Sequence, residues 1–141
     1  MNAASSAASA RAAAGLLAFA LVTAEPAAAA PCSVNVGWHV VLASDAVDPD
    51  VFVWDSRPRL VDYAAGQWGD TKAIFAHTML VRPGTQALVI ACAAGQAHPK
   101  YSSSDEDVVG VKVLSGPFRG RYGWVLAGDA HPMRERAAKA Q

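Results

Sequence analysis

Hydrophobic and polar residues alternate along several short stretches of the chain, and clusters of proline, glycine and aspartate separate these stretches. Alternation places successive side chains on opposite faces of an extended backbone and predicts a β-strand, and short runs of β-branched and aromatic residues, such as 51–54, also predict strands. The predicted strands are residues 32–43, 51–54, 72–81, 86–93, 108–115 and 122–127. Residues 60–69 fit no single pattern and suit either a loop with aromatic anchors or a turn of helix.

Turn-forming residues connect these predicted strands. Residues 82–85 read Arg-Pro-Gly-Thr, a turn sequence that predicts a hairpin between the strands on either side of it. Residues 95–107 are polar and predict a solvated, mobile loop. Five to six short strands with little helix predict an all-β fold, either a small barrel or a sandwich. A barrel also removes the exposed edges of such a short, valine-rich sheet.

The first thirty residues have a different composition from the rest. Arg11 precedes an apolar run over residues 12–22, and small residues follow that run up to Ala30. This order is typical of a secretory signal peptide, and the run is shorter than the roughly 20 residues that cross a membrane as a helix. The sequence therefore predicts a periplasmic or secreted protein that is not an integral membrane protein. The folded domain is predicted over residues 31–132, with a charged tail over 133–141.

Two cysteines are present, Cys32 and Cys92. In an exported protein, an even pair of cysteines is most simply one disulfide bond. The alternative is two buried free thiols, because apolar residues surround Cys92. A disulfide closing this long loop would stabilise the domain by about 4 kcal/mol in the chain-entropy treatment.

The net charge and the absence of certain motifs argue against nucleic-acid binding, metal binding and catalysis. The formal net charge is zero, so no strong long-range attraction to nucleic acid is expected. The histidines have no metal-ligand spacing with one another or with a cysteine, and no serine lies in a nucleophile elbow. The histidines are His39, His77, His98 and His131. We therefore expect no metal, no cofactor and no enzyme activity.

The stretch Val111–Leu126 carries the most informative pattern. Val111 and Val113 alternate with Lys112 and predict a strand whose valines face the core. A Gly-Pro turn follows, and Gly120 and Gly123 allow a bulge or a close crossing where the next strand begins. In that strand Tyr122, Trp124 and Leu126 share one face, opposite Gly123, Val125 and Ala127.

The sequence VKVLSGPFRGRYGWV, residues 111–125, resembles the closing hairpin of bacterial SH3-like domains, with an apolar strand, a glycine turn and a terminal Gly-Trp-Val. The Pro-Gly-Thr turn at 83–85 is similar to a turn of the same family. The Gly-Pro-Phe-x-Gly turn of this chain, at residues 116–120, is also similar to the KOW motif of ribosomal and transcription proteins. Export and zero net charge argue against the RNA contacts of that second family.

The SH3-like resemblance implies a small barrel and a non-catalytic binding module for peptidoglycan, a peptide or an envelope protein. Rigid aromatic side chains and arginines would provide the contacts of such a module. The candidate ligand-binding residues are Tyr63, Trp68, Arg119, Arg121, Tyr122 and Trp124. Trp54 is expected in the core, Trp124 fits the core or the surface equally well, and Trp68 is the better surface candidate.

Two other functions fit the sequence. The protein could be a structural subunit of an envelope complex, whose apolar faces a partner chain covers. It could also be an accessory of a cell-wall hydrolase that uses a carboxylate such as Asp70 with His77.

Overall fold

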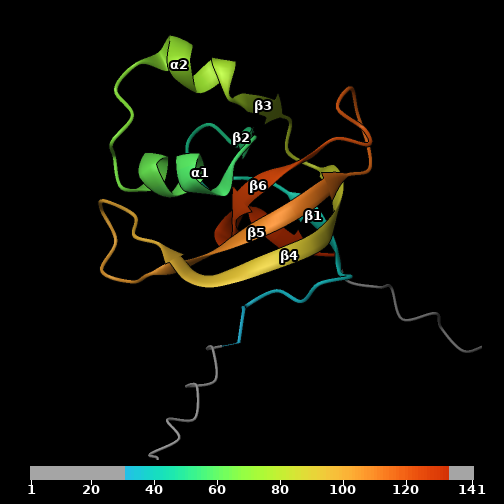
Figure 1. Cartoon of the computed structure of the whole chain (residues 1–141). Helices are drawn as coiled ribbons and strands as arrows, with labels where there is room; N and C mark the ends of the chain where they lie inside the picture. The colour runs from blue at the N-terminus through green and yellow to red at the C-terminus, as the bar shows by residue number, and fades with distance from the viewer. Residues whose placement is uncertain (1–30, 134–141) are drawn as a thin grey trace, which may run out of the picture.

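The computed structural model describes residues 31–133, which form one curled sheet of seven antiparallel strands, a half-barrel, with two helices beside it (Figure 1). The strand order is β3-β2-β6-β5-β4-β1-β7. The elements are β1 (His39–Leu42), β2 (Val51–Trp54), α1 (Arg57–Ala64), α2 (Thr71–Ala76), β3 (Thr78–Val81), β4 (Thr85–Ala97), β5 (Glu106–Val113), β6 (Tyr122–Leu126), the 3-10 turn η1 (Ala127–Asp129) and β7 (Ala130–Pro132). The predicted signal peptide, and the tail from residue 134 onward, lie outside the described residues.

The main core fills the inside of the curled sheet. Val109, Val111 and Val113 of β5 are fully buried there, and Lys112 between them is only half-buried. Val125 of β6 is buried in the same cluster, whereas Tyr122 at the start of that strand is exposed. The alternation predicted for both strands of this hairpin is confirmed, and β5 pairs with β6 in an antiparallel register.

A second, smaller core lies on the outer face of the sheet, beneath α1. Trp54, Leu60, Ala97 and Val108 form it and are buried. Val108 on β5 precedes Val109 of the main core, so successive residues of one strand serve the two cores. Helix α1 covers this face and gives the tryptophan at the end of β2 its predicted core position.

Helix caps account for two elements that the strand pattern did not reveal. The hydroxyl of Ser56 accepts a hydrogen bond from the Arg59 backbone N–H at the start of α1, where Pro58 suits the first turn. The carboxylate of Asp70 accepts one from the Lys72 N–H at 2.9 Å and begins α2. The prediction of one strand over 72–81 is therefore wrong, because a helix takes up its first half.

The Pro-Gly turn connects strands that do not pair with each other. β3 pairs with β2, whereas β4 pairs with β1 and β5. The predicted hairpin across residues 82–85 is wrong for this reason. The turn carries the chain from one edge strand to the middle of the sheet, and the Gly84 N–H donates to the Leu42 carbonyl at 3.0 Å.

The predicted all-β small barrel is confirmed in part: the structure is mostly β and its sheet curls into a half-barrel. The sheet has seven strands, not five or six, because β7 is added at one edge, and two helices accompany it. The expected first strand is shorter than residues 32–43 and begins at His39. β4 continues to Ala97 and β5 begins at Glu106, so part of the expected loop at 95–107 is strand.

β6 crosses β2 closely at a glycine. A Cβ atom added to Gly123 would lie 2.4 Å from Val53 Cγ1 and 2.7 Å from the Trp54 carbonyl oxygen. Trp54 pairs with Trp124 next to this point. The close crossing expected of this glycine is confirmed, and only a residue without a side chain fits there.

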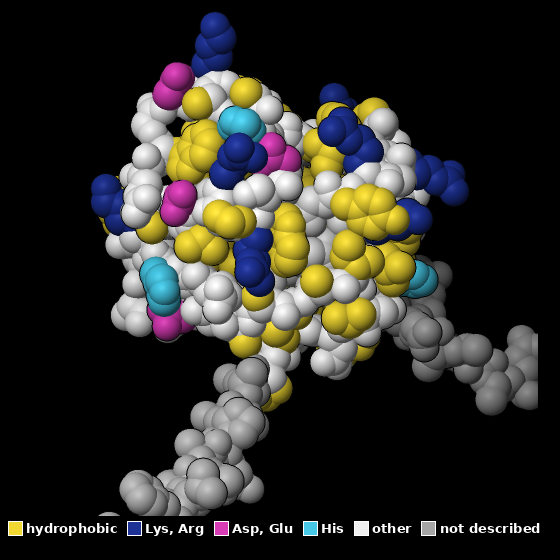
Figure 2. Space-filling view, in the orientation of Figure 1, with side chains coloured by type: hydrophobic (Ala, Val, Ile, Leu, Met, Phe, Trp, Pro, Cys, Tyr) yellow, Lys and Arg dark blue, Asp and Glu magenta, His cyan; other side chains and the backbone are white. Residues whose placement is uncertain are grey.

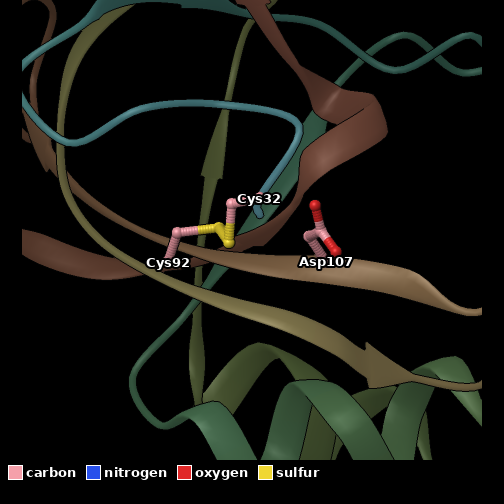
Figure 3. A group of neighbouring side chains, drawn as sticks. All are labelled: Cys32, Cys92 and Asp107. Carbon is pink, nitrogen blue, oxygen red and sulfur yellow. A yellow bond between two sulfur atoms is a disulfide. The ribbon is translucent and has the colours of Figure 1, made fainter. Parts of the chain in front are cut away.

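The predicted disulfide bond joins Cys32 to Cys92 of β4 (Figure 3). Asp107 of β5 lies beside it and accepts hydrogen bonds from the Ser33 backbone N–H at 2.7 Å, the Ser33 hydroxyl at 2.8 Å and the Gly95 N–H at 2.8 Å. The Ser33 N–H, followed by the other donors, holds the pKa of Asp107 below its usual value despite some burial. A covalent bond and a carboxylate thus fix the segment before β1 to the sheet.

Candidate functional site

A pocket lies between the end of α2 with β3 and the turn that joins β5 to β6. Its volume is about 170 Å³, which suits one chemical group of a ligand and not a whole drug-sized molecule. The residues that line it are Val53, Asp55, Ala76, His77, Thr78, Met79, Phe118, Arg121 and Tyr122. We refer to it as the Asp55–His77 pocket.

Asp55 and His77 line one wall, and Arg59, which does not line the pocket, pairs with the Asp55 carboxylate. The Nδ1 atom of His77 lies 2.9 Å from a carboxylate oxygen of Asp55, and Arg59 Nη1 lies 3.0 Å from each oxygen of the same carboxylate. Burial disfavours the charged form of Asp55, but the hydrogen bonds from His77 and Arg59 outweigh it and lower the pKa of Asp55. The aspartate is therefore ionised at neutral pH and orients the histidine ring.

Helix α2 positions the histidine. His77 is the C-cap residue of α2, and its backbone N–H donates to the Ile74 carbonyl at 3.1 Å. The Asp55 N–H donates to the His77 carbonyl at 3.0 Å, so the two residues are joined through backbone as well as side chain. The ring of His77 also packs edge-on against Trp68, with 5.8 Å between ring centres.

The opposite wall comes from the β5–β6 turn. Arg121 and Tyr122 are both exposed, with Tyr122 at 60%, and Figure 2 shows Lys and Arg side chains gathered over this turn. The Arg121 guanidinium lies 6.0 Å from the ring centre of Phe118, and Lys112 Nζ lies 5.7 Å from that of Tyr122. A guanidinium fork binds carboxylates bidentately, so this wall is suited to an anionic group.

An apolar hollow adjoins the same turn. Its volume is about 440 Å³, and Leu80, Thr85, Pro117 and Phe118 are among its lining residues. Phe118 lines both hollows, and Leu80 is 38% exposed. A ligand that places a polar group in the Asp55–His77 pocket can therefore cover apolar surface on the far side of Phe118.

The structure separates the predicted binding residues into two groups. Arg121 and Tyr122 line the Asp55–His77 pocket, and Arg119 is exposed on the same turn without lining it. Tyr63 and Trp68 instead pack against Trp54 with 5.0 Å between ring centres in each pair.

Trp124 belongs with the second group. It is half-buried against the outer core, and the Arg57 guanidinium lies 5.7 Å from its ring centre. Its position thus combines the core and surface roles that the sequence left open. The aromatic residues that support the outer core are not on the wall that carries Arg121.

The sequence did not reveal the actual roles of two site residues, Asp55 and His77. His77 was considered with Asp70, but Asp70 caps α2 and the partner of His77 is Asp55. Asp55 lies directly after the predicted strand 51–54 and is not among the predicted site residues. Its only local signal is Arg59 four residues later, a spacing that pairs charges on a helix.

The described residues contain one group of side chains with metal-ligating atoms close together, Cys32, Cys92 and Asp107. The two sulfur atoms are joined in the disulfide, so no thiolate is available there to bind a metal. Within residues 31–133 no helix is long and apolar enough to cross a membrane.

Comparisons of the chain with known protein families, with curated proteins and with solved structures give no match. The assignment of function therefore rests on the geometry of the pocket and on the chemistry of the groups that line it.

Proposed function

We propose that the protein is an exported, non-catalytic binding module with an SH3-like barrel that recognises a peptide segment in the cell envelope, either in peptidoglycan or in a protein. The observation that carries this proposal is the pocket in which Arg121 and Tyr122 stand across from the ordered Asp55–His77 pair. The pocket offers an anion-binding wall and, across from it, the ring of His77 as a hydrogen-bonding group, which suits the charged ends and polar groups of a peptide.

The SH3-like assignment is supported by the hairpin on which the resemblance depends. β5 and β6 pair antiparallel from Val108 with Leu126 to Lys112 with Tyr122, and β6 holds the Gly-Trp-Val sequence. The strands β7, β1, β4, β5 and β6 are consecutive neighbours in the sheet. In this proposal they are the barrel, and residues 43–84 are an insertion that carries both helices.

Export is supported by the disulfide bond. Disulfides form and persist in oxidising compartments, and Cys32–Cys92 is compatible with such a location. The signal-peptide pattern of residues 1–30 agrees with it.

In the proposed binding mode, a ligand carboxylate pairs with Arg121 and the adjoining part of the ligand lies on the exposed ring of Tyr122. The ligand then passes over Phe118 to the apolar hollow that contains Leu80 and Pro117. Peptides with free carboxylates meet these requirements, and the stem peptides of peptidoglycan are among them.

The test is retention of the purified protein by insoluble peptidoglycan and, separately, by proteins of a detergent-solubilised envelope extract immobilised on beads. Arg121→Ala should weaken retention about tenfold, because it removes a charge-assisted contact. Arg119→Ala is the matched control, since Arg119 lies on the same turn but does not line the pocket. Equal retention of the two variants would overturn the proposed site.

A structural subunit is the second candidate, and exposed apolar residues favour it. Val36 is 63% exposed, and Trp38 and Ile90 are also exposed. The segment that carries Val36 and Trp38 is hydrogen-bonded to Val89, next to Ile90, through the Gly37 N–H and the Trp38 carbonyl. Concentration-dependent association in sedimentation experiments, lost in Trp38→Ser, would favour this function over a peptide-binding one.

A further inference from the structure

A third pocket, of about 350 Å³, lies on the other side of β2, between the loop after β1, helix α1 and the end of β6. It has no lining residue in common with the Asp55–His77 pocket. Its size falls in the range of pockets that bind small molecules or whole side chains.

The first wall of this pocket is acidic. Asp48, Asp50 and Asp129 line it, and none of its lining residues is Lys, Arg or His. Burial, and then the nearby charge of Glu106, raise the pKa of Asp129 to about 6, whereas His131 lowers it and Asp45 raises it further. At neutral pH three carboxylates therefore face the pocket with no cation lining it.

The second wall is aromatic. Phe52, Trp54 and Tyr63 line the pocket, and the tyrosine ring packs edge-on to Phe52 at 6.2 Å and tilted against Trp54 at 5.0 Å. These contacts bring the three rings together in one wall of the pocket. Aromatic faces attract cations, and they also accept the methylene groups of a long side chain.

An unpaired hydrogen-bond donor gives a third, independent observation. Trp54 is fully buried, and its indole Nε1 has no hydrogen-bond partner in the part of the chain that the structure describes. A buried donor without an acceptor costs free energy, and such groups are rare. An acceptor supplied by a ligand in the pocket would satisfy it.

We propose that this pocket binds an alkylammonium group, with its amine against Asp50 and Asp129 and its methylene chain against Phe52 and Tyr63. The ligand class is a lysine-type residue within a peptide, whose carbonyl groups can accept from the Trp54 indole N–H once a side-chain movement exposes that buried atom. A free diamine has the same cationic end but lacks such an acceptor.

The test is a titration of the purified protein with N-acetyl-L-lysine amide, followed by ¹H–¹⁵N NMR. The indole signal of Trp54 is assigned by its loss in Trp54→Phe. We expect saturable shifts of this indole signal and of backbone signals of α1 and the loop after β1. N-acetyl-norleucine amide, which has the same length of aliphatic chain without the amine, should give none.

A second titration with 1,5-diaminopentane distinguishes the two sources of the amine. Tighter binding of the lysine compound assigns the pocket to a peptide, because only that ligand offers carbonyl acceptors. Tighter binding of the diamine would overturn the peptide assignment. Equal shifts from the lysine and norleucine compounds would overturn the alkylammonium proposal as a whole.

Charge-removing variants identify the site. Asp50→Asn and Asp129→Asn should each weaken binding of the lysine compound about fivefold, as expected for one partly exposed ion pair. Asp62→Asn on α1 is the control, since Asp62 is exposed and does not line the pocket. Unchanged affinity in both pocket variants, with intact NMR spectra, would show that the amine binds elsewhere. Arg121→Ala should leave this binding unchanged, so a failure here is separate from a failure of the proposed peptide site.

Discussion

Asp129→Asn should stabilise the protein at neutral pH, although the substitution removes a charged residue from the wall of a pocket. Asp129 follows β6 in the turn η1 and is partly buried, and its pKa is raised to about 6 from the ordinary 3.8 by burial and by Glu106. Its ionised form is therefore disfavoured in the folded protein. Asparagine has nearly the same shape and never ionises, so the variant avoids this cost.

The magnitude follows from the two pKa values. Their difference corresponds to about 3 kcal/mol between the protonation states at neutral pH. Asp129 keeps part of its contact with solvent, which screens the effect, so we expect a gain of about 1–2 kcal/mol. Because the folded-state pKa is the higher one, the stabilising effect of protonation is complete below pH 3.8. It is lost as the pH rises through 6.

The assay is urea unfolding of the wild type and Asp129→Asn at several pH values from 4 to 7.5. The two proteins should have similar free energies of unfolding at pH 4, and the variant should gain steadily up to about pH 6.5. Asp62→Asn, which removes the same charge from an exposed position on α1, corrects for the change in net charge. A difference that does not grow between pH 4 and 7, or a less stable variant at pH 7, would refute the reasoning.

Three other substitutions test features of the fold. Replacing Cys32 and Cys92 by serine should lower the free energy of unfolding by about 4 kcal/mol, measured by urea unfolding, and a reducing agent should then have no further effect on the variant. Gly123→Ala should destabilise the protein by about 3 kcal/mol or more, because the Cβ atom of the alanine would overlap Val53 and the Trp54 carbonyl. Gly69→Ala is the control, since Gly69 has open space around it, and it should change the melting temperature little. Asp107→Asn should reduce stability at pH 7, because the lowered pKa of Asp107 means that its carboxylate stabilises the fold above pH 3.8. The difference from the wild type should shrink as the pH falls through the folded-state pKa, which acid titrations followed by circular dichroism would show.

Local patterns were sufficient for several of the strands. Val51–Trp54 was predicted with its observed bounds, and the β5–β6 hairpin was found from its alternating valines and its glycines. The disulfide followed from the number of cysteines and the expected compartment. In each case the information lies in residues close together in the sequence or in the composition of the whole chain.

Helix α2 and the pairing of β3 were not predictable in the same way. Residues 72–76 are mostly apolar and adjoin a true strand, so their pattern is shared by a helix and a strand. The signal that decides between them is one capping carboxylate, Asp70. The partner of β3 is β2 and not β4, which depends on how the whole sheet curls and not on the turn between β3 and β4.

Only part of the candidate site could be predicted from the sequence. Arg121 and Tyr122 could be selected because a binding hairpin was suspected, but the wall across from them consists of residues from another part of the chain. Asp55 and His77 are 22 residues apart and meet because β2 and β3 pair at that end of the sheet. No spacing rule within a single element can reveal such a pair.

The pairing of β1 with β7 has a consequence for when the protein can fold. Val40 lies opposite Pro132, so the strand formed early in the sequence takes its outer partner from the last described residues. Contacts between such distant residues form slowly, and until they form, β1 has an unpaired edge. Synthesis must therefore reach Pro132 before β1 can gain its outer partner and the sheet can be completed.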